Sequence, residues 1–181
     1  MEKSNPITRK QRLFWGVVLS IIVSDAFTKM LAVDRLTPAY SPRALLGNGL
    51  RLTLVYNPGA AFGLHLGPYS RWIFTALTLG ALVLLANLYR STRAGDRIRT
   101  LALALVCGGA LGNLADRLKS GRGVVDFIDV GIGIHRWPTF NVADMAVSCG
   151  AVALALVLWR EDGLTAARSV AARGQDEPIH G

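Results

Sequence analysis

The segment Gly108-Gly-Ala-Leu-Gly-Asn-Leu-Ala-Asp-Arg117 ends a long apolar run with an amide, an acid and a base. Gly108 and Gly112 have the small-xxx-small spacing that lets membrane helices approach closely. Asn113 and Asp116 are three residues apart, so they share a helix face, and Arg117 is a ready counter-ion. An ionised carboxylate costs several kcal/mol in hydrocarbon, so an acid in such a place usually lines a cavity or has a partner. The segment therefore predicts a polar site at one end of a membrane-spanning helix.

Four apolar segments of similar length predict a helical membrane protein. Hydrophobic residues make up 51% of the 181-residue chain, which argues against an ordinary soluble globule. Each segment is close to the roughly 20 helical residues that cross about 30 Å of hydrocarbon. The expected spans are residues 13–33, 71–88, 98–115 and 138–159. We therefore expect an all-α membrane fold of four transmembrane helices in a single domain, residues 13–160, between a basic tail (1–12) and a mobile polar tail (161–181).

The placement of lysine and arginine predicts the orientation of the chain. The net charge is +8, but the bases gather before the first span and in the short link between the second and third, whereas the loop of residues 34–70 holds few. Such clusters mark the cytoplasmic side of a membrane protein, so both termini are expected there and no nucleic acid is implied.

The basic start also resembles a secretory signal peptide. The apolar run is longer than a typical h-region, and Asp25 and Lys29 interrupt it, which favours an uncleaved first span.

The remaining unusual polar residues fall on the outward side of this topology. Asp25 and Lys29 are four apart and can pair; the alternative is an ion pair that snorkels at the outer boundary. Residues 50–56 alternate with period two, which predicts a strand leading into a small-residue loop at Asn57, for which a simple turn is the alternative. Residues 124–134 predict a second extended element. We expect the two to form a small outward β platform, about residues 43–63 and 122–136.

Acids from three separate segments can meet on that side: Asp116, Asp126 and Asp144, the last of which shares a helix face with Asn141. Two carboxylates a few ångströms apart cannot both ionise cheaply, so such a pair holds a single proton. The base of the pair can take a proton from a water that attacks a peptide carbonyl, while the acid protonates the oxyanion and the leaving amine. Which acid would carry the proton stays open.

Other chemistries have weaker support. His65 and His135 stand in predicted loops and Ser148 lies deeper in the fourth span, so no nucleophile–histidine pair competes. A metal site of aspartate and His135 lacks metal-ligand spacing, and we expect neither metal nor cofactor. Cys107 and Cys149 lie within spans and are expected to be packing residues rather than a disulfide or metal site.

Several blocks of the sequence, taken in order, resemble the signature blocks of the lipoprotein signal peptidase (signal peptidase II) family. They are Asn57-x-Gly-Ala-Ala-Phe62, Gly112-Asn-x-x-Asp-Arg117, Val124-Val-Asp-Phe127 and Phe140-Asn-x-Ala-Asp144, and they cover nearly the whole chain outside the tails. The resemblance implies an aspartic endopeptidase of the bacterial plasma (inner) membrane that uses no cofactor. It would act on prolipoproteins that carry diacylglyceryl on a cysteine, cutting immediately before that cysteine.

The resemblance also implies roles for individual residues. By the family pattern, Asp126 and Asp144 are the catalytic pair. The residues implied to shape and polarise the pocket are Asp25, Lys29, Asn57, Gly59, Ala60, Asn113, Asp116, Arg117 and Asn141. Ala26 stands where the family usually has glutamine. We expect the protein to act as a monomer, with lipid-modified prolipoproteins and membrane lipids as its partners.

Two other classes of protein would use the polar residues differently. A small transporter or channel component would spread Asp25, Asp116 and Asp144 through the membrane depth, usually with internal repeats, whereas here the acids gather at one end. A non-enzymatic membrane scaffold would tolerate free replacement of Asp126.

Overall fold

The protein folds into four long helices and a small antiparallel sheet in the computed structural model, which describes residues 5–61, 64–65 and 67–175, with side chains for 5–59 and 67–161. The helices are α1 (Pro6–Arg35), α2 (Ser70–Ser91, preceded by the 3₁₀ turn η1, Gly67–Tyr69), α3 (Arg97–Lys119) and α4 (Val142–Gln175). Each holds a stretch long and apolar enough to cross a membrane. The predicted four-helix membrane architecture is confirmed.

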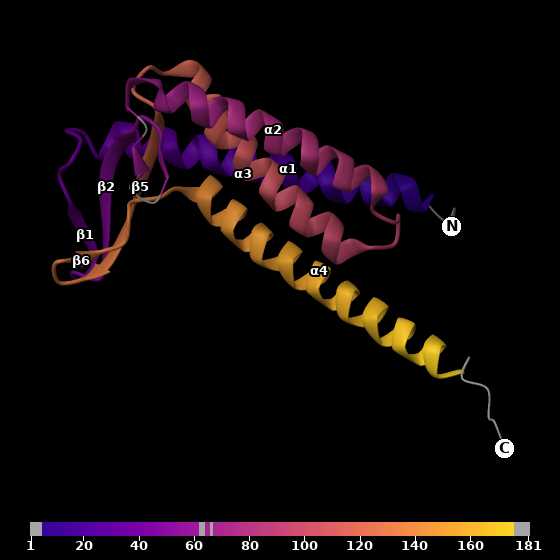
Figure 1. Ribbon diagram of the computed structural model, residues 1–181. Helices are drawn as coiled ribbons and strands as arrows, with labels where there is room; N and C mark the ends of the chain where they lie inside the picture. The colour runs from indigo at the N-terminus through magenta and orange to yellow at the C-terminus, as the bar shows by residue number, and fades with distance from the viewer. Residues whose placement is uncertain (1–4, 62–63, 66, 176–181) are drawn as a thin grey trace.

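Helix α3 is the centre of the bundle. It packs most extensively against α4 and α1, and α2 lies against it as well. In its most apolar stretch 56% of the residues are buried, against 11–22% in the other three helices, whose apolar residues face outward as expected in lipid. The start of α1 and the end of α4 lie at the end of the bundle away from the sheet (Figure 1).

Glycines on two faces of α3 permit this central position. A Cβ at Gly108 would lie 3.0 Å from the Ile21 side chain, and one at Gly112 would lie 2.7 Å from a carboxylate oxygen of Asp25, so these two glycines face α1. A Cβ at Gly109 would overlap the carbonyl oxygen of Ala143 at the start of α4. The predicted small-xxx-small contact is therefore confirmed, and a third glycine admits the helix that follows the sheet.

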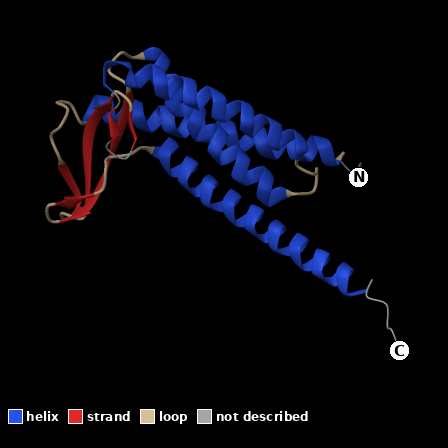
Figure 2. Ribbon diagram, in the orientation of Figure 1, coloured by secondary structure: helices blue, strands red, loops and turns tan. Residues whose placement is uncertain are grey.

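The sheet caps one end of the bundle (Figure 2). Its strand order is β1 (Arg43–Leu46), β2 (Leu50–Asn57), β5 (Val124–Ile132) and β6 (His135–Arg136), with all neighbours antiparallel. Asp126 pairs with Val55, and Asn57 pairs with Val124. A separate hairpin joins β3 (Ala60–Ala61) to β4 (Leu64–His65). The predicted strand over residues 50–56 and the β platform are confirmed.

Some helix ends differ from those expected. Helix α1 begins at Pro6 because the side chain of Asn5 caps the N–H of Ile7 at 3.0 Å, so part of the basic tail is helical. Helix α4 begins at Val142 rather than residue 138, because Phe140 forms an antiparallel bridge with Ile128 of β5 and holds the preceding loop against the sheet. At its other end α4 continues to Gln175, so residues 161–175 are helical.

Candidate active site

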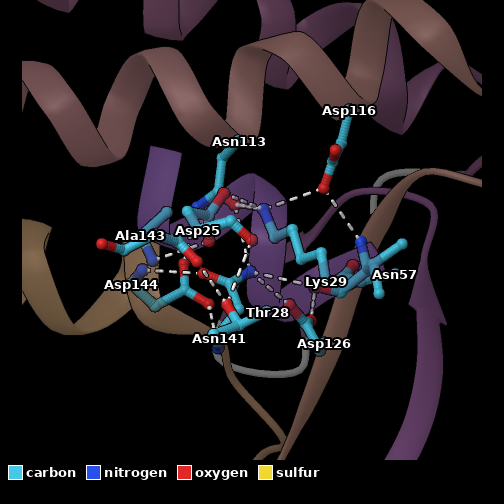
Figure 3. Close-up of polar contacts among 12 residues, drawn as sticks. Asp25, Thr28, Lys29, Asn57, Asn113, Asp116, Asp126, Asn141, Ala143 and Asp144 are labelled. Atoms are coloured by element: carbon cyan, nitrogen blue, oxygen red, sulfur yellow. Dashed lines mark hydrogen bonds and ion pairs between the residues drawn. The ribbon is translucent and has the colours of Figure 1, made fainter. Parts of the chain in front are cut away.

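The first turn of α4 is fixed by a reciprocal pair of hydrogen bonds. The N–H of Asp144 donates to Oδ1 of Asn141 at 2.9 Å, and the N–H of Asn141 donates to Oδ2 of Asp144 at 3.1 Å. This is a capping box, in which two residues three apart satisfy each other's backbone donors at a helix start. It orients the Asp144 carboxylate at the end of the helix nearest the sheet (Figure 3).

The Asp126 carboxylate reaches the same place from strand β5. It is 2% exposed, and its two oxygens accept hydrogen bonds from Nδ2 of Asn141 at 2.7 Å and Nδ2 of Asn57 at 3.1 Å. Asn141 therefore touches both acids, Asp126 through its side-chain amide and Asp144 through its backbone N–H. A single residue thus brings together two acids that lie 18 positions apart in the sequence, Asp126 and Asp144.

Asn113 of α3 links this pair to a second polar cluster. Its Nδ2 donates to Oδ1 of Asp144 at 2.7 Å. Its Oδ1 accepts from Nδ2 of Asn141 at 3.1 Å and from the ammonium of Lys29 at 3.0 Å. Both ends of the amide are used, so its orientation is determined by its neighbours.

The second cluster is centred on Lys29, whose side chain points between α1 and α3 (Figure 3). Its ammonium lies 2.7 Å from Oδ2 of Asp25, 2.8 Å from Oδ2 of Asp116 and 3.0 Å from Asn113, so all three of its N–H donors have acceptors. Asp25 is 1% exposed and Lys29 is 4% exposed. The alternative of an ion pair snorkelling at the boundary is therefore wrong. Both side chains are buried, and Lys29 also contacts Asn113 and Asp116 of α3.

The cluster also connects the elements that carry the two acids. Oδ1 of Asp25 accepts the N–H of Ala143 in the first turn of α4 at 2.9 Å. Oδ2 of Asp116 accepts the N–H of Val125, beside Asp126 in β5, at 3.2 Å. The four acids thus divide into two kinds. Asp25 and Asp116 share a cation, whereas Asp126 and Asp144 accept hydrogen bonds from side-chain amides and a backbone N–H.

The environment of Asp126 favours its protonated form. Burial, and after it the charge of the nearby Asp144 carboxylate, raise the pKa of Asp126 to about 7. Hydrogen bonds from Asn57 and Asn141 and the charge of Lys29 act the other way and are outweighed. Asp126 is therefore suited to hold a proton near neutral pH beside a second carboxylate.

Both acids line a pocket of about 760 Å³. Its polar end holds Asn57, Asn113, Arg117 and the two acids, and one wall is the loop from Trp137 to Phe140. Another wall runs along the first two turns of α4 through Met145, Val147, Ser148 and Cys149. The pocket thus joins the buried Asp126 and the half-buried Asp144 to a more apolar surface on a membrane-spanning helix, which suits a substrate with both a peptide bond and an apolar part.

Arg117 and the loop at Asn57 are the remaining site residues predicted from the sequence. Arg117 forms no ion pair with Asp116, contrary to the counter-ion role predicted for it, because Lys29 occupies that position. Arg117 instead lines the pocket, where its charge acts on Asp144, Asp126 and Asp116. Gly59 adopts φ +122° and donates its N–H to Oδ1 of Asn57 at 3.0 Å. The side chain of Ala60, and Phe62 altogether, lie outside the described residues.

Some groups that contribute to the site could not be recognised in the sequence. The backbone N–H groups of Ala143 and Val125 have no side-chain signature, and the pocket walls at Tyr56, Thr139 and Met145 carry no motif. Cys149 is exposed and lines the pocket, so it is not the packing residue that its place in a span predicts, whereas Cys107 is buried. Within the described residues, no group of three or more His, Cys, Asp or Glu side chains could hold a metal ion.

Comparison with known proteins identifies the family. The signal peptidase II family model matches residues 17–160. A lipoprotein signal peptidase of Burkholderia mallei (strain SAVP1) is 43% identical over 141 residues, which cover 77% of this chain and 82% of that protein. One of Burkholderia vietnamiensis (strain G4 / LMG 22486) is 40% identical over 153 residues, which cover 83% of this chain and 90% of that protein. A solved bacterial membrane enzyme superposes with a TM-score of 0.72 at 26% identity, over 82% of this chain and 88% of that one. The chain therefore belongs to the lipoprotein signal peptidase (signal peptidase II) family, multi-pass aspartic peptidases of bacterial membranes that remove signal peptides from prolipoproteins.

Proposed function

We propose that Asp126 and Asp144 are the catalytic dyad of this signal peptidase and that they activate one water for attack on the peptide bond immediately before a lipid-modified cysteine. The observation that carries the proposal is the double hydrogen bonding of Asn141, which holds both carboxylates at the same pocket. Asp25 and Asp116 are unsuitable for the role because both are engaged in ion pairs with Lys29. Family membership excludes the transporter and scaffold alternatives.

The two acids have different roles in the reaction. Asp126 starts protonated, since its pKa is raised to about 7, and Asp144 starts as the carboxylate. Asp144 takes a proton from the water as its oxygen bonds to the carbonyl carbon, and Asp126 gives its proton to the carbonyl oxygen. Asp144 then protonates the amine as the C–N bond breaks, and Asp126 recovers a proton from the hydroxyl. The products are a carboxyl-terminated signal peptide and a free amine on the lipidated cysteine.

Arg117 supports the substrate in this scheme. Its Nε is buried and has no hydrogen-bond partner among the described residues, although the residue lines the pocket beside the dyad. An unsatisfied buried donor is costly unless something fills it. A carbonyl oxygen of the bound peptide fills that position, next to the bond that is cut.

The apolar wall of the pocket suits the lipidated side of the substrate. Met145, Val147 and Cys149 belong to the membrane-spanning part of α4, so acyl chains on the substrate cysteine can lie along this helix within the lipid. The peptide lies above them, between the Asn57 loop and the loop from Trp137 to Phe140. All these residues come from one chain, so a monomer is sufficient.

The dyad faces the outer side of the membrane in this proposal. The start of α1 and the α2–α3 link, which carry clustered lysines and arginines, lie at the opposite end of the bundle from the sheet. Single cysteines in a variant lacking Cys107 and Cys149 test this. A membrane-impermeant thiol reagent added to spheroplasts should label Asn48→Cys but not Arg93→Cys, and the reverse pattern would overturn the orientation.

The dyad assignment is tested with purified protein and a synthetic prolipoprotein carrying diacylglyceryl. Asp126→Asn and Asp144→Asn keep the side-chain shape but remove the transferable proton, and each should lower kcat by about a thousandfold or more. Asp34→Asn is the matched control, because Asp34 is exposed and lies outside the pocket. Cleavage at the wild-type rate by either dyad variant would refute the dyad assignment. Cleavage elsewhere than before the cysteine would refute the proposed position of the cut in the substrate.

A further inference from the structure

A second pocket lies at the opposite end of the bundle from the dyad, where α1 begins and α2 is linked to α3. Its volume is about 310 Å³, and its lining includes Pro6, Arg9, Lys10 and Leu13 of α1 and Arg97 and Thr100 of α3. Figure 1 shows this end of the molecule, near the marked N-terminus. The size is at the lower end of the roughly 300–1,000 Å³ typical of small-molecule sites.

Cations from two helices converge on this pocket. Among the residues that the structure describes, neither Arg9 nor Arg97 forms an ion pair. Lys10 is held in place by hydrogen bonds of 2.6 Å to the carbonyl oxygens of Tyr89 and Thr92 at the end of α2. The ammonium also lies 4.2 Å from the centroid of the Tyr89 ring, and among the described residues it has no acid partner, so its positive charge is not balanced by a carboxylate. The pocket therefore offers three positively charged groups to an anion.

The nearby acids are already engaged. Oδ1 of Asp96 caps α3 by accepting the N–H of Arg99 at 2.9 Å. Oε2 of Glu161 pairs with the guanidinium of Arg99 at 2.6 Å. Neither acid lines the pocket, so its lining carries an excess of positive charge.

The lining of the pocket also includes apolar residues. They are Pro6, Leu13 and Ala94, and Leu13 directly precedes Phe14 and the exposed Trp15. Aromatic side chains near the end of a span are typical of a membrane interface. A free phosphate gains nothing from apolar walls, whereas a phospholipid presents a phosphate and apolar chains together. We infer that this pocket binds the phosphate of an anionic phospholipid from the membrane leaflet at this end of the bundle, so that a lipid bridges α1 and α3.

Lipid binding is measured by native mass spectrometry of the detergent-purified full chain, titrated with phosphatidylglycerol or with zwitterionic phosphatidylcholine. Wild type should retain phosphatidylglycerol in preference to phosphatidylcholine. Arg9→Gln/Arg97→Gln should bind phosphatidylglycerol about tenfold more weakly, because each basic residue near a membrane surface contributes to attraction of anionic lipid. The matched control is Arg90→Gln/Arg93→Gln, which removes the same charge from the same end of the molecule but from outside the pocket, and it should bind as wild type does.

Three outcomes would overturn the inference. Equal losses in the two double variants would show general attraction of charge rather than a site. Equal binding of the anionic and zwitterionic lipids would show that the cations do not select the ligand. If inorganic phosphate alone raises the thermal unfolding midpoint of the wild type as much as phosphatidylglycerol does, the pocket is a site for a free anion rather than for a lipid. Peptidase activity is not the readout, so the test is independent of the dyad.

Discussion

The Nδ2 atom of Asn141 lies 2.7 Å from Oδ1 of Asp126, and this hydrogen bond ties the start of α4 to strand β5. Asn141 is fully buried, and the same residue caps α4 through Asp144. Helix capping and the placement of the proposed dyad are therefore one structural feature. A change at Asn141 alters the relative position of the two acids while leaving both of them present.

Asn141→Ala removes this link. We expect kcat to fall about a hundredfold, since the acids lose their common orientation, with a smaller change in KM. Loss of the cap should also cost about 1 kcal/mol of stability. Steady-state kinetics and thermal unfolding in detergent measure the two effects. Asn48→Ala is the control, because Asn48 is exposed and lies outside the pocket, and a variant at 141 with unchanged kcat would contradict the positioning role.

Lys29→Met leaves the buried Asp25 and the partly buried Asp116 without their shared cation. Removal of one partner from a buried ion pair costs about 3–5 kcal/mol, so the unfolding midpoint should drop markedly. Adding Asp25→Asn and Asp116→Asn to Lys29→Met should recover part of the loss, because the uncompensated charges are removed. If the triple variant is no more stable than the single one, Lys29 does not act by neutralising these acids. Lys119→Met, at an exposed position, is the control.

Gly112→Ala tests the closeness of α1 and α3. The added Cβ would lie 2.7 Å from Oδ2 of Asp25, the oxygen that pairs with Lys29, so the carboxylate must move. We expect lower thermal stability and reduced activity together. Gly80→Ala in α2 should be neutral or slightly stabilising, because nothing lies within 4 Å of a Cβ there and alanine favours helix over glycine. Equal behaviour of the two variants would contradict the packing described for Gly112.

The rate of cleavage should depend on pH through Asp126. With its pKa raised to about 7, the single-proton state of the dyad is lost as the pH rises above about 7, and kcat/KM should fall there. The profile is measured between pH 5 and 9 in one detergent and at one ionic strength. A rate that keeps rising beyond pH 8 would contradict the proposed acid role.

The same group makes stability depend on pH. The pKa of Asp126 in the folded protein, about 7, exceeds its ordinary value of 3.8, so its contribution to stability is fully present below about pH 4 and is lost as the pH rises through 7. The unfolding midpoint of the wild type should therefore fall between about pH 4 and 7 and level off above that range. Asp126→Asn should show a smaller fall over that interval, and an identical fall in both proteins would assign the effect to other groups.

Much of the architecture could be predicted because it depends on local patterns. Apolar runs of membrane-spanning length indicate the helices, and the alternation over residues 50–56 indicates the strand. The small-xxx-small spacing of Gly108 and Gly112 indicates a close helix contact, which α1 makes. The gathering of polar residues at one end follows from the alternating direction of the spans.

The pairing within the site could not be predicted in the same way. The spacing of Asn113, Asp116 and Arg117 gives a shared face of α3 but not the rotation of α1 that brings Lys29 to Asp116. The Asn141–Asp144 spacing is visible as a capping signature only once the helix start is known. That start depends on the bridge between Phe140 and Ile128, which belong to different segments. Long-range contacts of this kind decide which acid is neutralised and which is available.

The most direct test of the dyad is to observe its proton by infrared difference spectroscopy, comparing the purified protein across pH 5 to 9. We predict a protonated carboxyl band in the wild type that titrates near pH 7 and is absent from Asp126→Asn, because Asp126 holds the shared proton. Asp144→Asn should retain a carboxyl band, with its titration moved to lower pH since the neighbouring negative charge is gone. A titrating band that persists in Asp126→Asn, or no band in the wild type at pH 6, would contradict the assignment of the proton to Asp126.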